Sequence, residues 1–135
     1  MDSGTTAVGA TNSIVNNAVP EYTTYSYVGY FLAPTTGNYT FSLASDDRSW
    51  MWIGNDALSG AFTTSNYITS TTYNTGTITS TNIAMTAGTY YPIRIVYGNG
   101  AVAGFGISLS FTGPSIASTT NGTGYFFYNA DTTGI

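Results

Sequence analysis

The chain of 135 residues is long enough for one domain with a buried core, and it is poor in charged side chains. Only 6% of the residues are charged, with two Arg, no Lys and a net charge of −4, which argues against nucleic acid and anionic membranes as partners. Without Cys there are no disulfides or thiolate metal sites. Without His, any bound metal takes oxygen ligands, which favours calcium or magnesium.

The first predicted elements are two strands joined by a turn. Residues 1–20 are rich in Gly, Ser, Thr, Asn and Ala and predict a lead-in or edge segment, followed by a single domain over residues 21–135. The aromatic and Thr-rich stretch 22–33 predicts a strand, and Pro34-Thr35-Thr36-Gly37 predicts a turn. Residues 37–44 alternate strictly between apolar and polar side chains, which is typical of a half-buried strand. We therefore expect these two strands to form a hairpin.

Short strands separated by Gly- and Asn-containing turns follow along the rest of the chain. They are predicted over residues 50–53, 77–85, 90–97, 105–111 and 124–128, with loops around short strands over residues 58–76. No stretch shows a helical period. The connections are too short for crossover helices, so the sequence predicts an all-β fold, an antiparallel, jelly-roll-like β-sandwich of about eight or more strands.

Asp46 and Asp47 form the one adjacent pair of acids and directly follow the predicted strand 37–44. Two neighbouring carboxylates repel each other, and a bound cation is one way to relieve that repulsion. In an extended trans chain, neighbouring side chains point in opposite directions, so both reach one ion only across a sharp turn or a cis bond. The alternative is a solvated turn in which Arg48 screens the charge.

Asn99 is a second candidate ligand, because an Asn carbonyl oxygen and nearby backbone carbonyls suit a hard cation. The alternative there is an ordinary Asn-Gly turn at the end of a strand. Trp50 and Trp52 have rings that stack on sugars, but their spacing places both on one face of a strand and favours the core. Arg94 lies in the middle of a predicted strand and favours a structural role.

The sequence gives little support for an enzyme. No His, Cys or Lys is present to activate a nucleophile among the many hydroxyl groups. A pair of carboxylates hydrolyses a glycoside only when roughly 5–9.5 Å separate them, and Asp46 and Asp47 are too close if they share an ion. Asp56 is the one alternative partner considered for either of them. We therefore expect a protein without catalytic residues.

Three segments, in this order, resemble the GLEYA and flocculin adhesin domains, which belong with the fourteen-kilodalton domain of anthrax protective antigen. They run from Val28 to Phe41 (VGYFLAPTTGNYTF), from Ser45 to Gly54 (SDDRSWMWIG) and from Thr86 to Asn99 (TAGTYYPIRIVYGN). The similarity extends over about residues 27–111. The literal GLEYA string and the cysteines of the fungal members are absent from this chain.

This resemblance implies a calcium site. In lectin members of the family, two Asp joined by a cis peptide bind one calcium ion, and an Asn and two backbone carbonyls complete the set. In this chain, the resemblance implies Asp46, Asp47, Asn99 and the carbonyls of Ala101 and Ala103. The calcium would bind two neighbouring sugar hydroxyls, and the expected sugar contacts are Asp46, Asp47, Asn99 and Arg48.

The function that follows is a calcium-dependent carbohydrate-binding lectin or adhesin module of a larger multidomain surface protein. The expected partner is a cell-surface or polymeric glycan, with no nucleic acid and no direct membrane insertion, and the expected location is extracellular, on a cell or virion surface. The alternative is a structural β-sandwich module that contacts proteins without binding sugar. The loop over residues 100–104 leaves this alternative open, because it has no charged or aromatic side chain with which to select a sugar.

Overall fold

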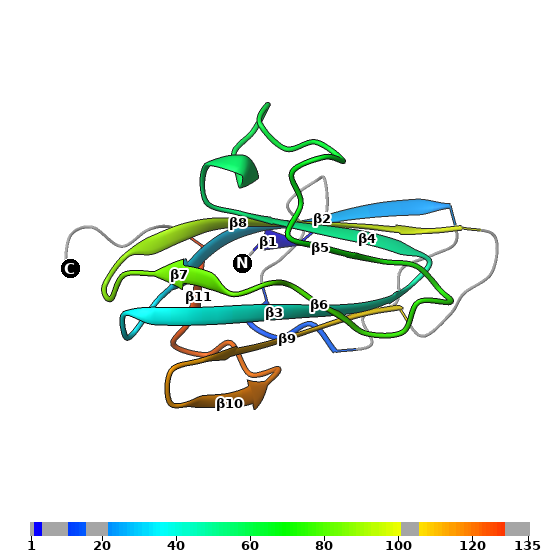
Figure 1. The fold of residues 1–135 in the computed structure, drawn as a ribbon. Coiled ribbons are helices and arrows are strands. Elements are labelled where there is room, and N and C mark those ends of the chain that lie inside the picture. Colours follow the sequence, from blue (N-terminus) through cyan, green and yellow to red (C-terminus); the bar gives the residue numbers. More distant parts are fainter. Residues whose placement is uncertain (1, 4–10, 16–21, 101–105, 129–135) are drawn as a thin grey trace.

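The computed structural model describes residues 2–3, 11–15, 22–100 and 106–128. Within these residues, two antiparallel sheets face each other across one core (Figure 1). The strand order is β1-β2-β8-β4-β5 in the first sheet, with β11 also on β2, and β10-β9-β3-β6 in the second, with β7 also on β3. The predicted all-β sandwich is thus confirmed. None of the helical structure in the described residues has the length and apolar character needed to span a membrane.

The longer strands begin and end close to the predicted stretches. The first sheet contains β1 (Asp2–Ser3), β2 (Thr23–Leu32), β4 (Arg48–Ile53), β5 (Thr69–Thr71), β8 (Tyr90–Asn99) and β11 (Phe126–Phe127). The second contains β3 (Gly37–Asp46), β6 (Ile78–Thr79), β7 (Ile83–Met85), β9 (Gly106–Gly113) and β10 (Ile116–Thr119). A short 3-10 helix, η1 (Gly54–Ala57), follows β4.

The core forms where the apolar halves of the alternating strands meet. Its buried residues are Ile14, Tyr27, Phe31, Ala33, Tyr39, Phe41, Leu43, Met51, Met85, Ile93, Ile95, Tyr97, Ile107, Leu109, Phe111 and Phe126. The alternation predicted for residues 37–44 is visible in this set, and the burial of β3, β8 and β9 alternates along each strand. Residues 11–15 also pack here, with the Leu109 backbone N–H donating to the Ile14 carbonyl at 2.9 Å.

The predicted hairpin between the first two strands is wrong. β2 pairs with β8 along its whole length, whereas β3 pairs with β9, so the turn after β2 carries the chain from one sheet to the other. The Tyr39 hydroxyl donates to the Thr35 carbonyl at 2.6 Å and fixes this crossing. The physical reason is that both strands carry an aromatic inner face. The Phe31 and Phe41 rings meet across the core, with centroids 5.2 Å apart.

The strand predicted over residues 77–85 is divided into β6 and β7, both of which pair with β3. Ser80 lies between them, and its backbone N–H donates to the Phe41 carbonyl at 2.8 Å. The Ser80 hydroxyl also accepts from the Phe41 N–H at 3.1 Å. The Ser80 hydroxyl therefore accepts the hydrogen bond that a backbone carbonyl of a regular partner strand would accept, and regular strand pairing is interrupted at this point. Strand β10 has no counterpart among the predicted strands.

The expectation that Trp50 and Trp52 share one face of the strand and are buried is confirmed for Trp52 and wrong for Trp50, which is only partly buried. Ser49 and Met51 take the inward positions of β4, so both indoles lie on the outer face of the first sheet. Trp52 is nevertheless only 3% exposed, because the segment after η1 covers it. Its Nε1–H donates to the Thr63 carbonyl at 2.7 Å, and its ring lies 5.0 Å from the Phe62 ring.

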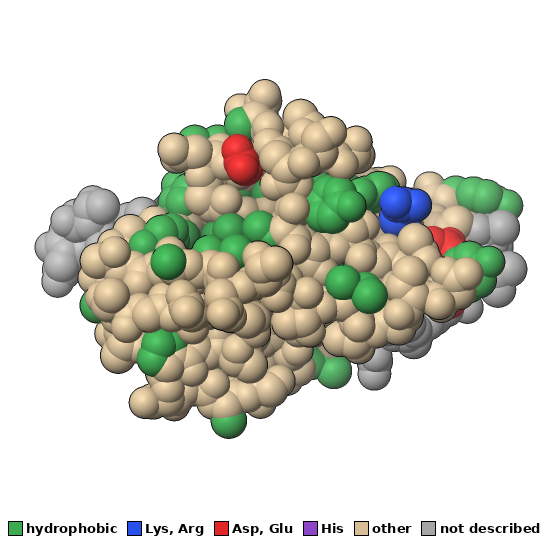
Figure 2. Space-filling view, in the orientation of Figure 1, with side chains coloured by type: hydrophobic (Ala, Val, Ile, Leu, Met, Phe, Trp, Pro, Cys, Tyr) green, Lys and Arg blue, Asp and Glu red, His purple; other side chains and the backbone are tan. Residues whose placement is uncertain are grey.

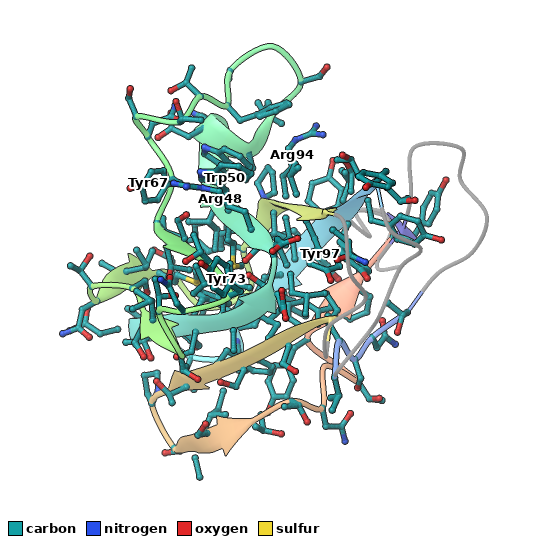
Figure 3. The ribbon with its side chains drawn as sticks, turned by 90° about the vertical axis from the view of Figure 1, so that its right-hand side faces the viewer. Arg48, Trp50, Tyr67, Tyr73, Arg94 and Tyr97 are labelled. Atoms are coloured by element: carbon teal, nitrogen blue, oxygen red, sulfur yellow. The ribbon has the colours of Figure 1, made fainter. Side chains whose placement is uncertain are left out.

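Arg94 has the structural role that its position predicts. Its Nε–H donates to the Ala57 carbonyl at 2.8 Å, and its guanidinium lies 4.4 Å from the centre of the Phe62 ring. Figure 3 shows Arg48, Trp50 and Arg94 on the outer side of the sheet. The side chain thus holds η1 and the segment that follows it against β8.

Candidate functional site

The Asp pair lies at one end of the sandwich, where β3 ends and β4 begins. Asn99 is the last residue of β8, and β8 pairs with β4 so that Arg48 faces Gly98. The next backbone N–H along the chain, that of Gly100, donates to Asp47 Oδ2 at 2.5 Å. The structure therefore brings together three of the predicted site residues, Asp46, Asp47 and Asn99, from two different sheets.

The backbone of the Asp pair is held by two hydroxyl groups. The peptide bond between Asp46 and Asp47 is cis, as the family resemblance implies. The Tyr97 hydroxyl donates to the Asp46 carbonyl, and the Ser45 hydroxyl donates to the Asp47 carbonyl at 2.9 Å. Tyr97 is fully buried and Ser45 is 2% exposed, so both donors come from the interior. The carbonyl of each Asp is fixed from the core side by these donors.

Beneath the pair lies a buried triangle of hydroxyls from Ser45, Ser49 and Thr71. The distances between their oxygens are 2.6 Å for Ser45 and Thr71, 2.8 Å for Ser49 and Thr71, and 2.9 Å for Ser49 and Ser45. All three residues are at most 2% exposed. The triangle ties β3, β4 and β5 together below the site. We did not predict these residues, although Ser45 and Ser49 occupy inward positions that are otherwise apolar.

The electrostatics of the site match two carboxylates held close together. Burial, the neighbouring charge of Asp47 and a hydrogen bond with Asp47 together raise the pKa of Asp46 above its ordinary value of 3.8. Burial and the negative charges of Asp46 and Asp47 raise the pKa of Tyr97 to about 12. Tyr97 therefore remains a neutral donor at physiological pH, and an added cation would lower the repulsion between the two Asp.

The oxygen donors present fit a hard cation such as calcium. Two carboxylates and an amide are suitable ligands, and the Asn99 Oδ1 atom, one residue before the Gly100 N–H that donates to Asp47, is wholly buried. In the part of the chain that the structure describes, no group of three or more His, Cys, Asp and Glu side chains is found. An ion at this place would therefore also depend on backbone carbonyls. The predicted carbonyl ligands, Ala101 and Ala103, lie outside the described residues.

Arg48 was predicted as a sugar contact, and Asp56 was considered only as an alternative partner for the Asp pair. Arg48 is exposed, and its guanidinium lies 5.0 Å from the centre of the Trp50 ring on the outer face. Asp56 lies in η1, beyond the opposite end of β4 from the Asp pair. Six strand residues span about 20 Å at ~3.3 Å each, which exceeds the carboxylate separation that glycoside hydrolysis requires. The arrangement thus does not pair Asp56 with Asp46 or Asp47.

Gly100 carries the closest backbone contact to the site, and sequence reasoning did not select it. A Cβ atom at this position would lie 2.6 Å from Asp47 Oδ2, which is well inside van der Waals contact. We expect Gly100→Ala to displace the Asp47 carboxylate and remove its hydrogen bond. The expected costs are about 1–3 kcal/mol of stability and about a tenfold loss of calcium affinity, measured by chemical denaturation and calorimetry.

The matched control for this change is Gly98→Ala. The nearest atom to a Cβ at Gly98 is Thr24 Oγ1 at 4.0 Å, so the methyl group has room. Gly98→Ala should leave calcium affinity unchanged. Equal losses in both variants would contradict the role of Gly100, because they would show a general effect of substitution in this strand.

The raised pKa of Asp46 predicts a pH-dependent stability in calcium-free buffer. A raised carboxyl pKa means that the folded state binds more protons, so this contribution to stability is present below 3.8 and is lost as pH rises through the raised pKa. Asp46→Asn imitates the protonated form. We expect it to raise the melting temperature at pH 7 in the presence of a chelator, with the gain disappearing at low pH. A constant difference across pH would contradict the electrostatic explanation.

Comparison with known proteins identifies relatives of this arrangement. A family model described as the GLEYA domain matches residues 23–113. The flocculation protein FLO9 of Saccharomyces cerevisiae is 34% identical in an alignment of 125 positions that covers 82% of this chain and 9% of that protein. The cell agglutination protein pfl4 of Schizosaccharomyces pombe is 31% identical in an alignment of 128 positions that covers 90% of this chain and 19% of that protein. The chain therefore spans less than a fifth of the length of either relative.

Solved structures share the fold. The A domain of epithelial adhesin 6 from Candida glabrata, in complex with Galb1-3GlcNAc, superposes with a TM-score of 0.64 and 24% identity, covering 82% of this chain and 53% of that one. The PA14 domain of the antifreeze protein MpAFP superposes with a TM-score of 0.59 and 13% identity, covering 81% of this chain and 53% of that one. At these identities the similarity shows the fold alone.

Proposed function

Because the chain belongs to the GLEYA domain family, we propose that it is a calcium-dependent carbohydrate-binding module of a larger cell-surface protein. One observation carries this proposal. Asp46 and Asp47 from the end of β3 lie against the end of β8, where Asn99 is buried and the Gly100 N–H binds Asp47. The relatives named for flocculation, cell agglutination and adhesion support a role in attachment between cells.

The site residues would have different roles in binding. Asp46, Asp47 and Asn99 would hold the calcium ion, which when bound offers open coordination positions to two neighbouring hydroxyls of a sugar. The carboxylates of Asp46 and Asp47 would also accept hydrogen bonds from those hydroxyls. Tyr97 and Ser45 hold the two Asp carbonyls, so the carboxylates approach the ligand from a fixed backbone.

The affinity for one sugar unit should be weak. The site lies at the surface and makes few contacts, which suggests a millimolar dissociation constant, or about 4 kcal/mol for a monosaccharide. Useful attachment would then require many copies on one surface, because linked binding events raise the overall avidity. A module within a long, cell-surface protein that meets a glycan-coated surface satisfies this condition.

A structural module that contacts proteins without binding sugar is the second candidate. It is favoured by the composition of residues 100–104, Gly-Ala-Val-Ala-Gly, which follow Asn99 directly and contain no side chain that selects a sugar by charge or stacking. In that case, calcium at Asp46 and Asp47 would stabilise the end of the sandwich, with protein ligands filling its coordination shell.

Binding to immobilised glycans, measured in calcium and again in chelator, tests the proposal. We expect a subset of glycans to bind in calcium, and the signal to disappear with chelator and in Asp47→Asn. Asp56→Asn is the matched control, because it removes the same charge at an exposed position in η1. Calcium binding without any glycan signal would instead favour the structural module.

A further inference from the structure

We propose that a groove on the outer face of the first sheet binds a second ring of the same glycan, stacked against Trp50. The groove has a volume of about 240 Å³. It is lined by Trp50, Trp52, Phe62, Thr63, Thr64 and Val96. This inference rests on the proposed function, and it defines the ligand as a glycan of at least two sugar units.

The groove is built into the fold. Figure 1 shows the segment between η1 and β5 rising above the outer face of the sheet, and Phe62, Thr63 and Thr64 belong to this segment. The Trp52 Nε1–H donates to the Thr63 carbonyl at 2.7 Å and to Asn66 Oδ1 at 2.9 Å. These two hydrogen bonds hold the segment between η1 and β5 in place over β4. Trp50 is only partly buried and forms part of the groove lining, while the Arg48 guanidinium lies over its ring at 5.0 Å from the centre.

The chemistry of the lining favours a neutral sugar ring. None of the residues that line the groove is charged, and most of the lining surface is apolar. A pyranose ring has C–H groups on its faces, so one face matches the apolar surface of an indole while the hydroxyls remain around the edge of the sugar. The volume is below that of sites for drug-sized ligands, which are roughly 300–1,000 Å³, and it suits one ring rather than a larger ligand.

The position of the groove connects it to the Asp pair. Trp50 follows Asp47 by three residues on β4, or about 10 Å at ~3.3 Å per residue. The exposed Arg48 lies between them, with its guanidinium over Trp50. Figure 2 shows hydrophobic, basic and acidic side chains next to one another along one face toward this end of the molecule. A glycan held by its first ring at the Asp pair would pass Arg48 and place its next ring on Trp50.

The two indole N–H signals of the chain allow a direct test by NMR, with Galb1-3GlcNAc and galactose as the ligands. Trp50→Phe identifies which signal belongs to Trp50. In calcium, the disaccharide should shift the Trp50 signal, whereas galactose should not. Trp50→Ala should lower the affinity for the disaccharide by about three- to tenfold and change the affinity for galactose by less than twofold.

Tyr128→Ala is the matched control, because Tyr128 is 54% exposed and lies outside the groove. Trp50→Phe should keep most of the affinity, since the smaller ring still stacks. Equal disaccharide affinity in the wild type and in Trp50→Ala would overturn the proposal that the groove binds a sugar ring, and it would leave the proposed calcium site unaffected. A wild-type protein that binds neither sugar in calcium would overturn both proposals. Disaccharide binding that survives Asp47→Asn but is lost in Trp50→Ala would overturn the calcium site and support the groove.

Discussion

Calcium at a hundredfold excess over its dissociation constant should stabilise the wild-type protein by about 2.7 kcal/mol, and Asp47→Asn should remove this effect. For a domain of this size, the shift in melting temperature is about 10 °C. Asp47→Asn removes one of the two charges that hold the cation, while the amide oxygen still accepts from the Gly100 N–H. The fold should therefore survive the change. Melting curves in calcium and in chelator measure both effects.

Asp56→Asn is the control that separates loss of the calcium site from loss of a negative charge elsewhere in the protein. Both variants raise the net charge by one, but Asp56 is exposed in η1 and lies apart from the Asp pair. The control should melt like the wild type, with and without calcium. A calcium shift that persists at full size in Asp47→Asn would show that the ion binds elsewhere.

Phe31→Ala should destabilise the domain by about 3–5 kcal/mol, the largest effect expected for a single substitution outside the site. Phe31 is fully buried, and its ring is 5.2 Å from Phe41, 5.4 Å from Phe111 and 5.6 Å from Phe126 by their centroids. Truncation would remove the contact between the two sheets at the centre of this cluster. Since domains are commonly stable by only 5–15 kcal/mol, the variant would lose a large share of its stability.

Urea denaturation of the wild type, Phe31→Ala and Phe31→Leu measures this effect. The Leu variant fills much of the volume and should lose less stability than the Ala variant. Tyr73→Ala provides the exposed aromatic control and should change stability by less than about 0.5 kcal/mol. A loss below about 1 kcal/mol in Phe31→Ala would contradict the central place of this ring in the core.

The strands were predictable where burial alternates along the chain. The side chains of β3, β8 and β9 alternate between buried and less buried positions, so apolar and polar residues alternate in their sequences with the two-residue period of a strand. The pairing of β2 was not predictable in the same way. Its turn to β3 has the residues of a hairpin turn, and only the match between Phe31 and Phe41 across the core distinguishes a crossing between sheets from a hairpin.

The site was predictable in part. The adjacent carboxylates identified one position and the Asn at a strand end identified another. Only the family resemblance joined Asn99 to the Asp pair, because no local pattern relates residues in the forties to residue 99. The positioning groups were missed for the same reason. Gly100 contacts a side chain 53 residues earlier, and Tyr97 bonds to a carbonyl 51 residues earlier. For the two Trp, the spacing predicted a shared face, but the inward positions of Ser49 and Met51 decided which face it was.

A calorimetric titration of calcium into the wild-type protein tests directly whether Asp46 and Asp47 hold a calcium ion. We expect one calcium ion per chain, with the heat of binding abolished in Asp47→Asn and retained in Asp56→Asn. The absence of any calcium-dependent heat would contradict the calcium site. Asp46 and Asp47 would then be a turn at the end of a GLEYA-type sandwich, and the domain would have to act without a bound cation.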